Sequence, residues 1–262
     1  MKGFSPNSKP KKNNKKLTFN MREALRRAFI FHKKGKFNEA SLLYEKLLNN
    51  SCKDPDFLSN YAVLLKRQGE FKKSKQLSIE AINLDPKRPA PYSNISLIFS
   101  MEGNHHEAIL YIKKALVLEP ESSKYLYNYG IFLHRNGQLN AAKKVLEKSI
   151  RISPDYDKSY AELAIINIGL SHMDEAERLI KKAISLNSNH AQYFSNLASI
   201  LTSQGQLFEA GEAALKALSF KTNHSKPLYI LSNSKSHSQN DAFLNQLFSS
   251  TFENNSSELN KM

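Results

Sequence analysis

Four asparagines recur inside apolar stretches of the chain at a regular spacing. Asn60, Asn94, Asn128 and Asn196 follow one another at intervals of 34, 34 and 68 residues. Each interrupts a segment with the apolar pattern of a helix, as in FLSNYAVLLKRQG at residues 57–69. Asparagine in a helix interior costs about 0.7 kcal/mol relative to alanine. A carboxamide carries a donor and an acceptor and can pair with a peptide group, so the spacing favours recognition of another chain's backbone.

The asparagines form one column of a 34-residue repeat that runs through most of the chain. Glycines stand at positions 35, 69, 103, 137 and 205, and Ser171 fills the missing slot. Small residues are frequent five and twelve positions after this slot, and proline follows seventeen positions after it in three copies. Glycine permits the turn that ends a helix, and proline stops the next helix. The pattern predicts two amphipathic helices per period, which can bury their apolar faces only by stacking into a solenoid.

A helix–turn–helix unit of this length, with these small, glycine and proline positions, resembles the tetratricopeptide repeat. The resemblance implies an all-α fold, a right-handed α-solenoid of six repeats with a C-terminal capping helix. The repeats begin near residues 21, 55, 89, 123, 157 and 191. We expect a basic disordered tail at 1–19, the solenoid at 20–224, a capping helix and a short terminal helix at 225–250, and a disordered tail at 251–262.

The helical period separates two faces of each first helix. Positions four, seven, eight and eleven should face the core, which predicts burial of Leu58, Tyr61, Ala62 and Leu65. In this family the first helices line a concave groove, so the opposite positions, six among them, should face a ligand. The resulting prediction for the peptide-binding groove comprises Asn60, Asn94, Asn128, Asn196, Lys66, Arg67, Tyr127, His134 and Arg135.

The asparagine column resembles the ladder in the repeat superhelix of the O-linked N-acetylglucosamine transferases, whose amides bond the backbone of an extended peptide. The alternative is that the asparagines bond neighbouring helices and only hold the stack. Bases at groove positions of the first, second and fourth repeats predict a basic N-terminal end and a neutral opposite end. This distribution favours a protein partner with an extended, acidic segment.

Composition and missing motifs narrow the function classes. The chain has a formal net charge of +14 and a single cysteine, Cys52, which excludes an internal disulfide and a CxxC pair. No phosphate-binding loop, dinucleotide fingerprint or hydrolase motif occurs. We therefore expect no enzyme activity, cofactor, metal or small-molecule substrate. No apolar run is long enough to span a membrane, and a cytoplasmic location is the simplest expectation.

The sequence favours a non-catalytic interaction scaffold that binds an extended peptide segment in the concave groove over two other functions. The layout resembles marine cyanobacterial tetratricopeptide proteins, some of which continue into a sulfotransferase domain. The alternative is therefore a substrate-recruiting module of a sulfotransferase- or glycosyltransferase-type enzyme, with the catalytic domain absent from this chain. Nucleic-acid binding by the basic tail and the paired lysines of the second helices is disfavoured, because no aromatic residues are interleaved with those lysines to stack bases. The sequence leaves the oligomeric state open.

Overall fold

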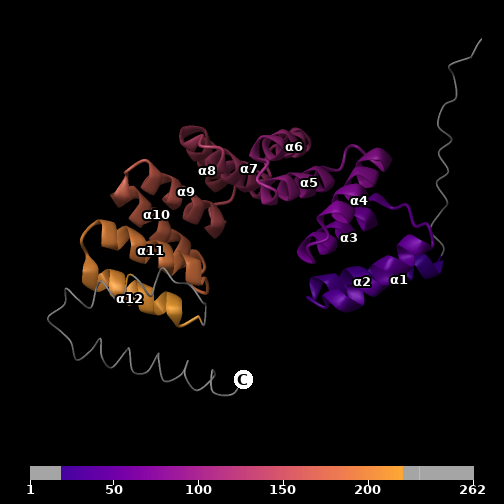
Figure 1. The fold of residues 1–262 in the computed structure, drawn as a ribbon, viewed down its shortest axis with the longest axis horizontal. Coiled ribbons are helices and arrows are strands. Elements are labelled where there is room, and N and C mark those ends of the chain that lie inside the picture. Colours follow the sequence, from indigo (N-terminus) through magenta and orange to yellow (C-terminus); the bar gives the residue numbers. More distant parts are fainter. Residues whose placement is uncertain (1–18, 221–229, 231–262) are drawn as a thin grey trace, which may run out of the picture. The chain divides into compact units, whose positions relative to one another are not determined.

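The structure is a computed structural model that describes residues 19–220 and residue 230 (Figure 1). The described residues contain twelve α-helices and no strand. The helices are α1 (Phe19–Lys33), α2 (Phe37–Asn49), α3 (Pro55–Arg67), α4 (Phe71–Leu84), α5 (Pro89–Met101), α6 (His105–Leu118), α7 (Ser123–Arg135), α8 (Leu139–Ile152), α9 (Asp157–Gly169), α10 (Met173–Leu186), α11 (Ala191–Ser203) and α12 (Leu207–Leu218). The odd-numbered helices are the first, or A, helices of the repeats, and the even-numbered helices are the second, or B, helices.

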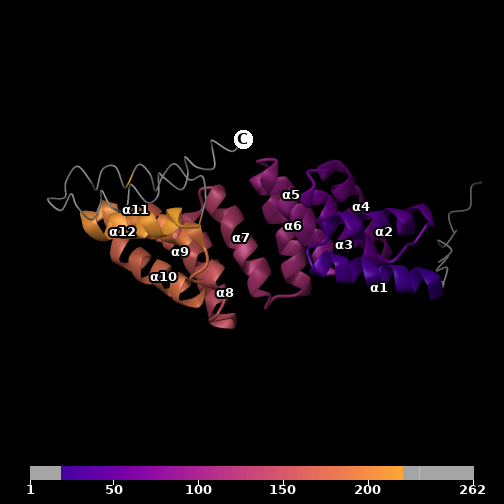
Figure 2. The same cartoon turned by 90° about the horizontal axis from the view of Figure 1, so that it is seen from below.

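The chain divides into two compact units, Met1–Leu118 and Glu119–Met262. The N-terminal unit contains α1 to α6 and the C-terminal unit contains α7 to α12. In both units each A helix packs against its own B helix, and that B helix packs against the A helix of the next repeat (Figures 1 and 2). This stacking is the arrangement predicted for amphipathic helix pairs that cannot bury their apolar faces alone.

Local signals explain where the helices begin and end. Pro55 and Pro89 stand in the first turn of their helices, where a missing N–H breaks no hydrogen bond. The Asp54 carboxylate caps α3 by accepting a hydrogen bond of 2.8 Å from the Phe57 N–H. Gly69 has a φ of 83°, and Ser171 holds the same left-handed conformation at 60°. The repeat slot thus imposes one turn geometry whether or not its residue is glycine.

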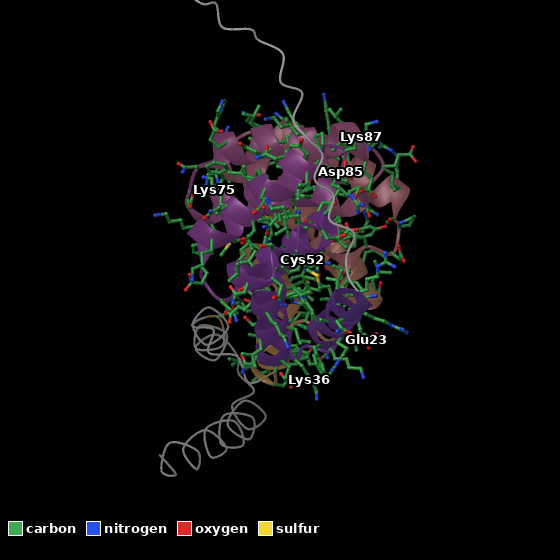
Figure 3. All side chains as sticks on the ribbon, turned by 90° about the vertical axis from the view of Figure 1, so that its right-hand side faces the viewer. Glu23, Lys36, Cys52, Lys75, Asp85 and Lys87 are labelled. Carbon is green, nitrogen blue, oxygen red and sulfur yellow. The ribbon has the colours of Figure 1, made fainter. Side chains whose placement is uncertain are left out.

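The predicted core residues are buried. Leu58 and Ala62 are fully buried, and Tyr61 and Leu65 are almost so. They belong to a cluster that also contains Cys52, and burial raises the pKa of the Cys52 thiol. In Figure 3, Cys52 lies among the helices, whereas Lys36 and Lys87 lie at the periphery.

The A helices of repeats two to six begin at residues 55, 89, 123, 157 and 191, as the period predicts. The helix α1 begins at Phe19, the last residue of the segment expected to be a disordered tail. The rest of that tail, most of the 225–250 segment and the 251–262 tail lie outside the described residues. From the 225–250 segment only Ile230 is described; it is helical and lies in the core cluster of Ala198, Leu201 and the α12 alanines.

No helix within residues 19–220 has the length and hydrophobicity needed to cross a membrane.

Candidate functional site

The candidate site is the surface formed by positions two, five, six, nine, twelve and thirteen of the A helices, here called the A-helix face of each unit. Position nine is aliphatic and half-buried in four repeats, at Val63, Leu97, Ile131 and Ile165. Position five is small and buried at Ser59, Ser93, Ala161 and Ser195. Each A-helix face therefore offers aliphatic contact area beside small residues that let another chain approach the helix backbones.

Asn94 is part of a hydrogen-bond network inside the N-terminal unit. Its side chain is almost fully buried, and Nδ2 donates to the Ser74 Oγ at 3.1 Å and to the Ser78 Oγ at 2.7 Å. The Ser74 hydroxyl in turn donates to the Ala62 carbonyl at 2.6 Å. The network joins α5 to α4 and α3, so the amide group of Asn94 holds the stack, as the alternative interpretation proposed for the whole column.

Asn196 occupies the same repeat position but has different neighbours. The residues that correspond to Ser74 and Ser78 in the repeat before Asn196 are Ala176 and Ile180, whose side chains cannot accept a hydrogen bond. The Asn196 Oδ1 accepts from the Gln192 Nε2 at 2.9 Å, while its buried Nδ2 has no partner among the described residues. An unpaired buried polar group costs about 1–3 kcal/mol.

Asn128 and Asn94 each also have one buried side-chain amide atom that lacks a hydrogen-bond partner. The Asn128 Nδ2 and the Asn94 Oδ1 are buried without a partner in the described part of the chain. Asn60, the fourth member of the column, is half-buried. The asparagine column therefore contains one amide nitrogen used by the stack and two amide nitrogens that the stack leaves unsatisfied.

A carboxylate replaces the amide in the fifth repeat. Glu162 lies on the A-helix face of the C-terminal unit, where its Oε1 is 2.7 Å from the His134 Nδ1. Tyr127 is half-buried and packs edge-on against Tyr156 at a centroid distance of 5.6 Å. Burial, and secondly the Glu162 charge, raise the pKa of Tyr127. The structure thus brings His134 together with a residue that the sequence prediction left out of the site, although Glu162 occupies the asparagine column.

A second carboxylate network links the ends of α9 and α11. The Tyr193 hydroxyl and the Asn187 Nδ2 donate to the Asp157 Oδ2 at 2.8 and 2.9 Å. Burial alone would raise the pKa of Asp157, but these hydrogen bonds outweigh burial and lower it. Sequence reasoning missed this network because its members lie 30 and 36 residues apart and no repeat column marks them.

The A-helix face of the N-terminal unit carries exposed positive charge. Arg22, Arg26 and Lys33 on α1 are exposed. On α3, the exposed Arg67 guanidinium lies 4.2 Å from the centre of the Phe37 ring. The predicted site residue Lys66 is half-buried on the same helix, and Arg135 is exposed on α7 of the C-terminal unit. The acid at position two of α3, Asp56, is paired with Arg88.

Within the described residues, no group of three or more histidine, cysteine, aspartate or glutamate side chains could hold a metal ion. The A-helix faces offer hydrogen-bonding groups, aliphatic contact area and positive charge, which are groups that bind another molecule.

Comparison with known proteins identifies the repeat. Two family models, both described as tetratricopeptide repeat, match residues 133–200 and 111–144. The two matches together cover residues 111–200, and the described helices have the helical solenoid fold of tetratricopeptide repeat structures. Tetratricopeptide repeats are protein-interaction modules. A search of curated protein sequences found no match.

Solved structures share the fold at low sequence identity. A chain of the APC/C hetero-tetramer Cut9–Hcn1 matches with a TM-score of 0.76 and 15% identity over 82% of this chain. The match spans 42% of that protein's chain, less than half its length. The type IV pilus biogenesis factor PilW matches with a TM-score of 0.72 and 17% identity over 82% of this chain and 99% of its own. YrrB, described as having an unusual peptide-binding site, matches at 0.53 and 19% identity over 71% and 96%. The resemblances to the two transferase groups stay predictions.

Proposed function

We propose that this protein is a non-catalytic scaffold whose A-helix faces bind an extended segment of a partner protein. The observation that carries the proposal is the pair of buried amide nitrogens, on Asn128 and Asn196, that lack a hydrogen-bond partner in the described chain. Selection for stability alone gives no reason to keep a carboxamide opposite Ala176 and Ile180. A role in binding a partner gives a reason to keep the carboxamide there.

Both nitrogens are buried in the unbound chain, so a bound peptide group would satisfy these amides only after the amide group turns. Rotation about the terminal side-chain bond exchanges the positions of Oδ1 and Nδ2, so the amide can present either a donor or an acceptor to a ligand. An extended chain exposes one N–H and one C=O per residue, and it places alternate side chains on opposite sides. Side chains on the near side would contact the aliphatic position-nine residues, such as Ile131 and Ile165.

The charge of the N-terminal unit favours an acidic stretch in the partner. Arg22, Arg26, Lys33 and Arg67 are exposed on its A-helix face, and Asp56 is already paired. Charge complementarity of this kind mainly raises the association rate and excludes wrong partners. YrrB has the same fold and a described peptide-binding site, which supports a binding role for the solenoid.

Substitution of the column separates the two roles of its asparagines. The test variant combines Asn60→Ala, Asn128→Ala and Asn196→Ala and leaves the stack-holding Asn94 intact. The matched control combines Asn38→Ala, Asn83→Ala and Asn140→Ala, which remove exposed amides from B helices. The probe is a twelve-residue peptide, three copies of Glu-Ser-Ile-Gly, titrated by calorimetry at low salt, and affinity capture from a lysate with the same variants would name the partner.

We expect the test variant to keep its helicity and to bind the peptide at least tenfold more weakly, whereas the control binds like the wild type. Affinity should also fall steeply between 50 and 200 mM salt, roughly the range in which surface charges become screened. Unchanged binding by the test variant would refute the role of the column. A loss of binding that is equal in both variants would point to general destabilisation and would also count against it.

A further inference from the structure

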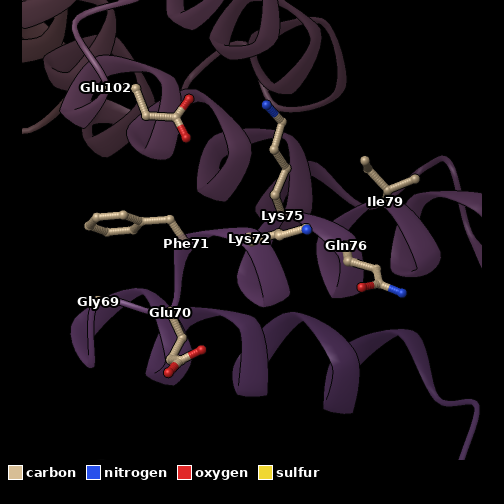
Figure 4. Close-up of a pocket in the computed structure, with 8 residues that line it drawn as sticks. All are labelled: Gly69, Glu70, Phe71, Lys72, Lys75, Gln76, Ile79 and Glu102. Carbon is tan, nitrogen blue, oxygen red and sulfur yellow. The ribbon is translucent and has the colours of Figure 1, made fainter.

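A second surface, on the B-helix side of the N-terminal unit, has the composition of a binding site. A hollow of about 740 Å³ opens beside α4 and is lined by Gly69, Glu70, Phe71, Lys72, Lys75, Gln76, Ile79 and Glu102 (Figure 4). Phe71, Lys75 and Ile79 follow one another at intervals of four residues and so share one side of α4. Glu102 follows Met101, the last residue of α5, as the C-cap of that helix. Because α4 is a B helix, the hollow is separate from the A-helix face.

The hollow combines an apolar wall with two lysines that form no ion pair within the described residues. Ile79 is 43% exposed, and the Phe71 side chain is half-buried. Lys72 is exposed, and no ion pair holds Lys72 or Lys75 within the described residues. The Glu70 carboxylate is already paired with the neighbouring Lys73 at 3.3 Å. A ligand with an apolar group and a negative charge would therefore find both partners available.

Aromatic packing fixes one of the two lysines in place. The Lys75 ammonium lies 3.6 Å from the centre of the Phe99 ring. Phe99 in turn packs against Tyr111 at 5.5 Å, and the Lys114 ammonium lies 4.6 Å from the centre of the Tyr111 ring. This alternation of cations and rings joins α4, α5 and α6. A lysine held in this way loses less side-chain freedom when it meets a ligand, and so it binds at a lower entropic cost.

We infer that this hollow is a docking site for a short peptide motif in which a large apolar residue is flanked by acidic residues. The apolar side chain would lie against Phe71 and Ile79, and the flanking carboxylates would face Lys72 and Lys75. Glu102 can accept a backbone N–H, and the Gln76 amide can bond a backbone C=O. A peptide motif thus uses every kind of group in the lining, which a fatty acid or a simple anion would not.

The observations favour a peptide over single-stranded nucleic acid. Aromatic rings do accompany lysines on this surface, contrary to the expectation from the sequence that none are interleaved with them. However, Lys75 and Lys114 cover one face each of the Phe99 and Tyr111 rings, so those faces are not open for stacking bases. The lining suits one or two carboxylates rather than a polyanion.

Calorimetry with the full-length chain tests the inference. The probe is the capped heptapeptide Ser-Gly-Asp-Phe-Asp-Gly-Ser, and two control peptides replace both aspartates by asparagine or the phenylalanine by alanine. The test variants are Lys72→Glu alone, which changes an exposed side chain, and Lys72→Glu with Lys75→Glu. The charge-matched control is Lys46→Glu with Lys87→Glu, at exposed positions of the same unit outside the hollow.

We expect both control peptides and the double test variant to lower the affinity at least tenfold, with a smaller loss for Lys72→Glu alone. The charge-matched control and the asparagine-column variant should bind like the wild type. The methyl resonances of Ile79 should shift on peptide addition, and those of Ile184 in the C-terminal unit should not. Equal weakening in the two double lysine variants would overturn the inference. The inference would also be overturned if the protein bound a twelve-residue oligothymidylate but not the peptide, and if the double test variant abolished the binding of the oligothymidylate.

Discussion

The substitution Gly130→Ala tests whether the packing of α7 against α8 requires a residue without a side chain at position 130. A Cβ atom added at this residue would lie 2.6 Å from the Leu146 Cγ and 2.8 Å from its Cδ2. Favourable carbon–carbon contacts are about 3.5–4.0 Å, and Leu146 is fully buried and has little room to move. Overpacking of a core typically costs about 1–3 kcal/mol, whereas alanine gains about 1 kcal/mol over glycine in helix propensity. We expect Gly130→Ala to destabilise the protein by about 1 kcal/mol.

The sign of this effect should reverse when the leucine is removed. Leu146→Ala alone should cost about 2–5 kcal/mol because it leaves a cavity. In that background the alanine at 130 no longer clashes, so Gly130→Ala should stabilise by about 0.5–1 kcal/mol. Gly169→Ala is the control, because its Cβ would meet the Leu139 Cδ1 at an ordinary 3.4 Å. Denaturant unfolding, monitored by circular dichroism, gives the free energy of unfolding of all four variants. An equal effect of Gly130→Ala in both backgrounds would refute the steric argument.

Two further predictions concern the repeat turn and the carboxylate network. Ser171 has a φ of 60° where the other repeats have glycine. Ser171→Gly should therefore stabilise the protein by about 0.5–1 kcal/mol in denaturant unfolding, and Gly137→Ser should destabilise it by a similar amount. A lower stability of Ser171→Gly would contradict this prediction. Asp157 has a lowered pKa in the folded state, so its charge contributes stability that is present above the unfolded pKa near 3.8 and is lost as the pH falls through the folded value. Asp157→Asn should therefore lower the free energy of unfolding by about 1–2 kcal/mol at pH 7 and by much less at pH 3. If the variant and the wild type differed by the same amount at both pH values, the carboxylate charge would play no part in stability.

Most of the fold could be predicted because its signals are local. The glycine slot, the prolines and the spacing of apolar residues act within one hairpin, and six copies in register reinforce one another. The helix starts at Pro55 and Asp157 and the burial of Leu58 and Tyr61 follow directly from that pattern. The first repeat is the least regular copy, and there the helix begins two residues before the predicted start.

The site was less predictable because a repeat column states which residues are equivalent but not what each one meets. Asn94 and Asn196 occupy the same slot, yet Asn94 bonds two serines of the preceding B helix, and Asn196 faces a repeat with Ala176 and Ile180 there. The signal was present in the sequence, at positions 20 and 24 of the preceding repeat. It becomes readable only once the packing of each B helix against the next A helix is known.

By itself the sequence determined the repeat, the starts of the A helices from the second repeat on, the buried face and the basic N-terminal A helices. All of these depend on residue types at fixed spacings along the chain. Tertiary structure alone decided which asparagine nitrogens are satisfied, that Glu162 meets His134, that Tyr193 and Asn187 converge on Asp157, and that a hollow opens between α4 and the end of α5. These features join residues of different helices. Their distances are set by how the helices pack, which no single repeat encodes.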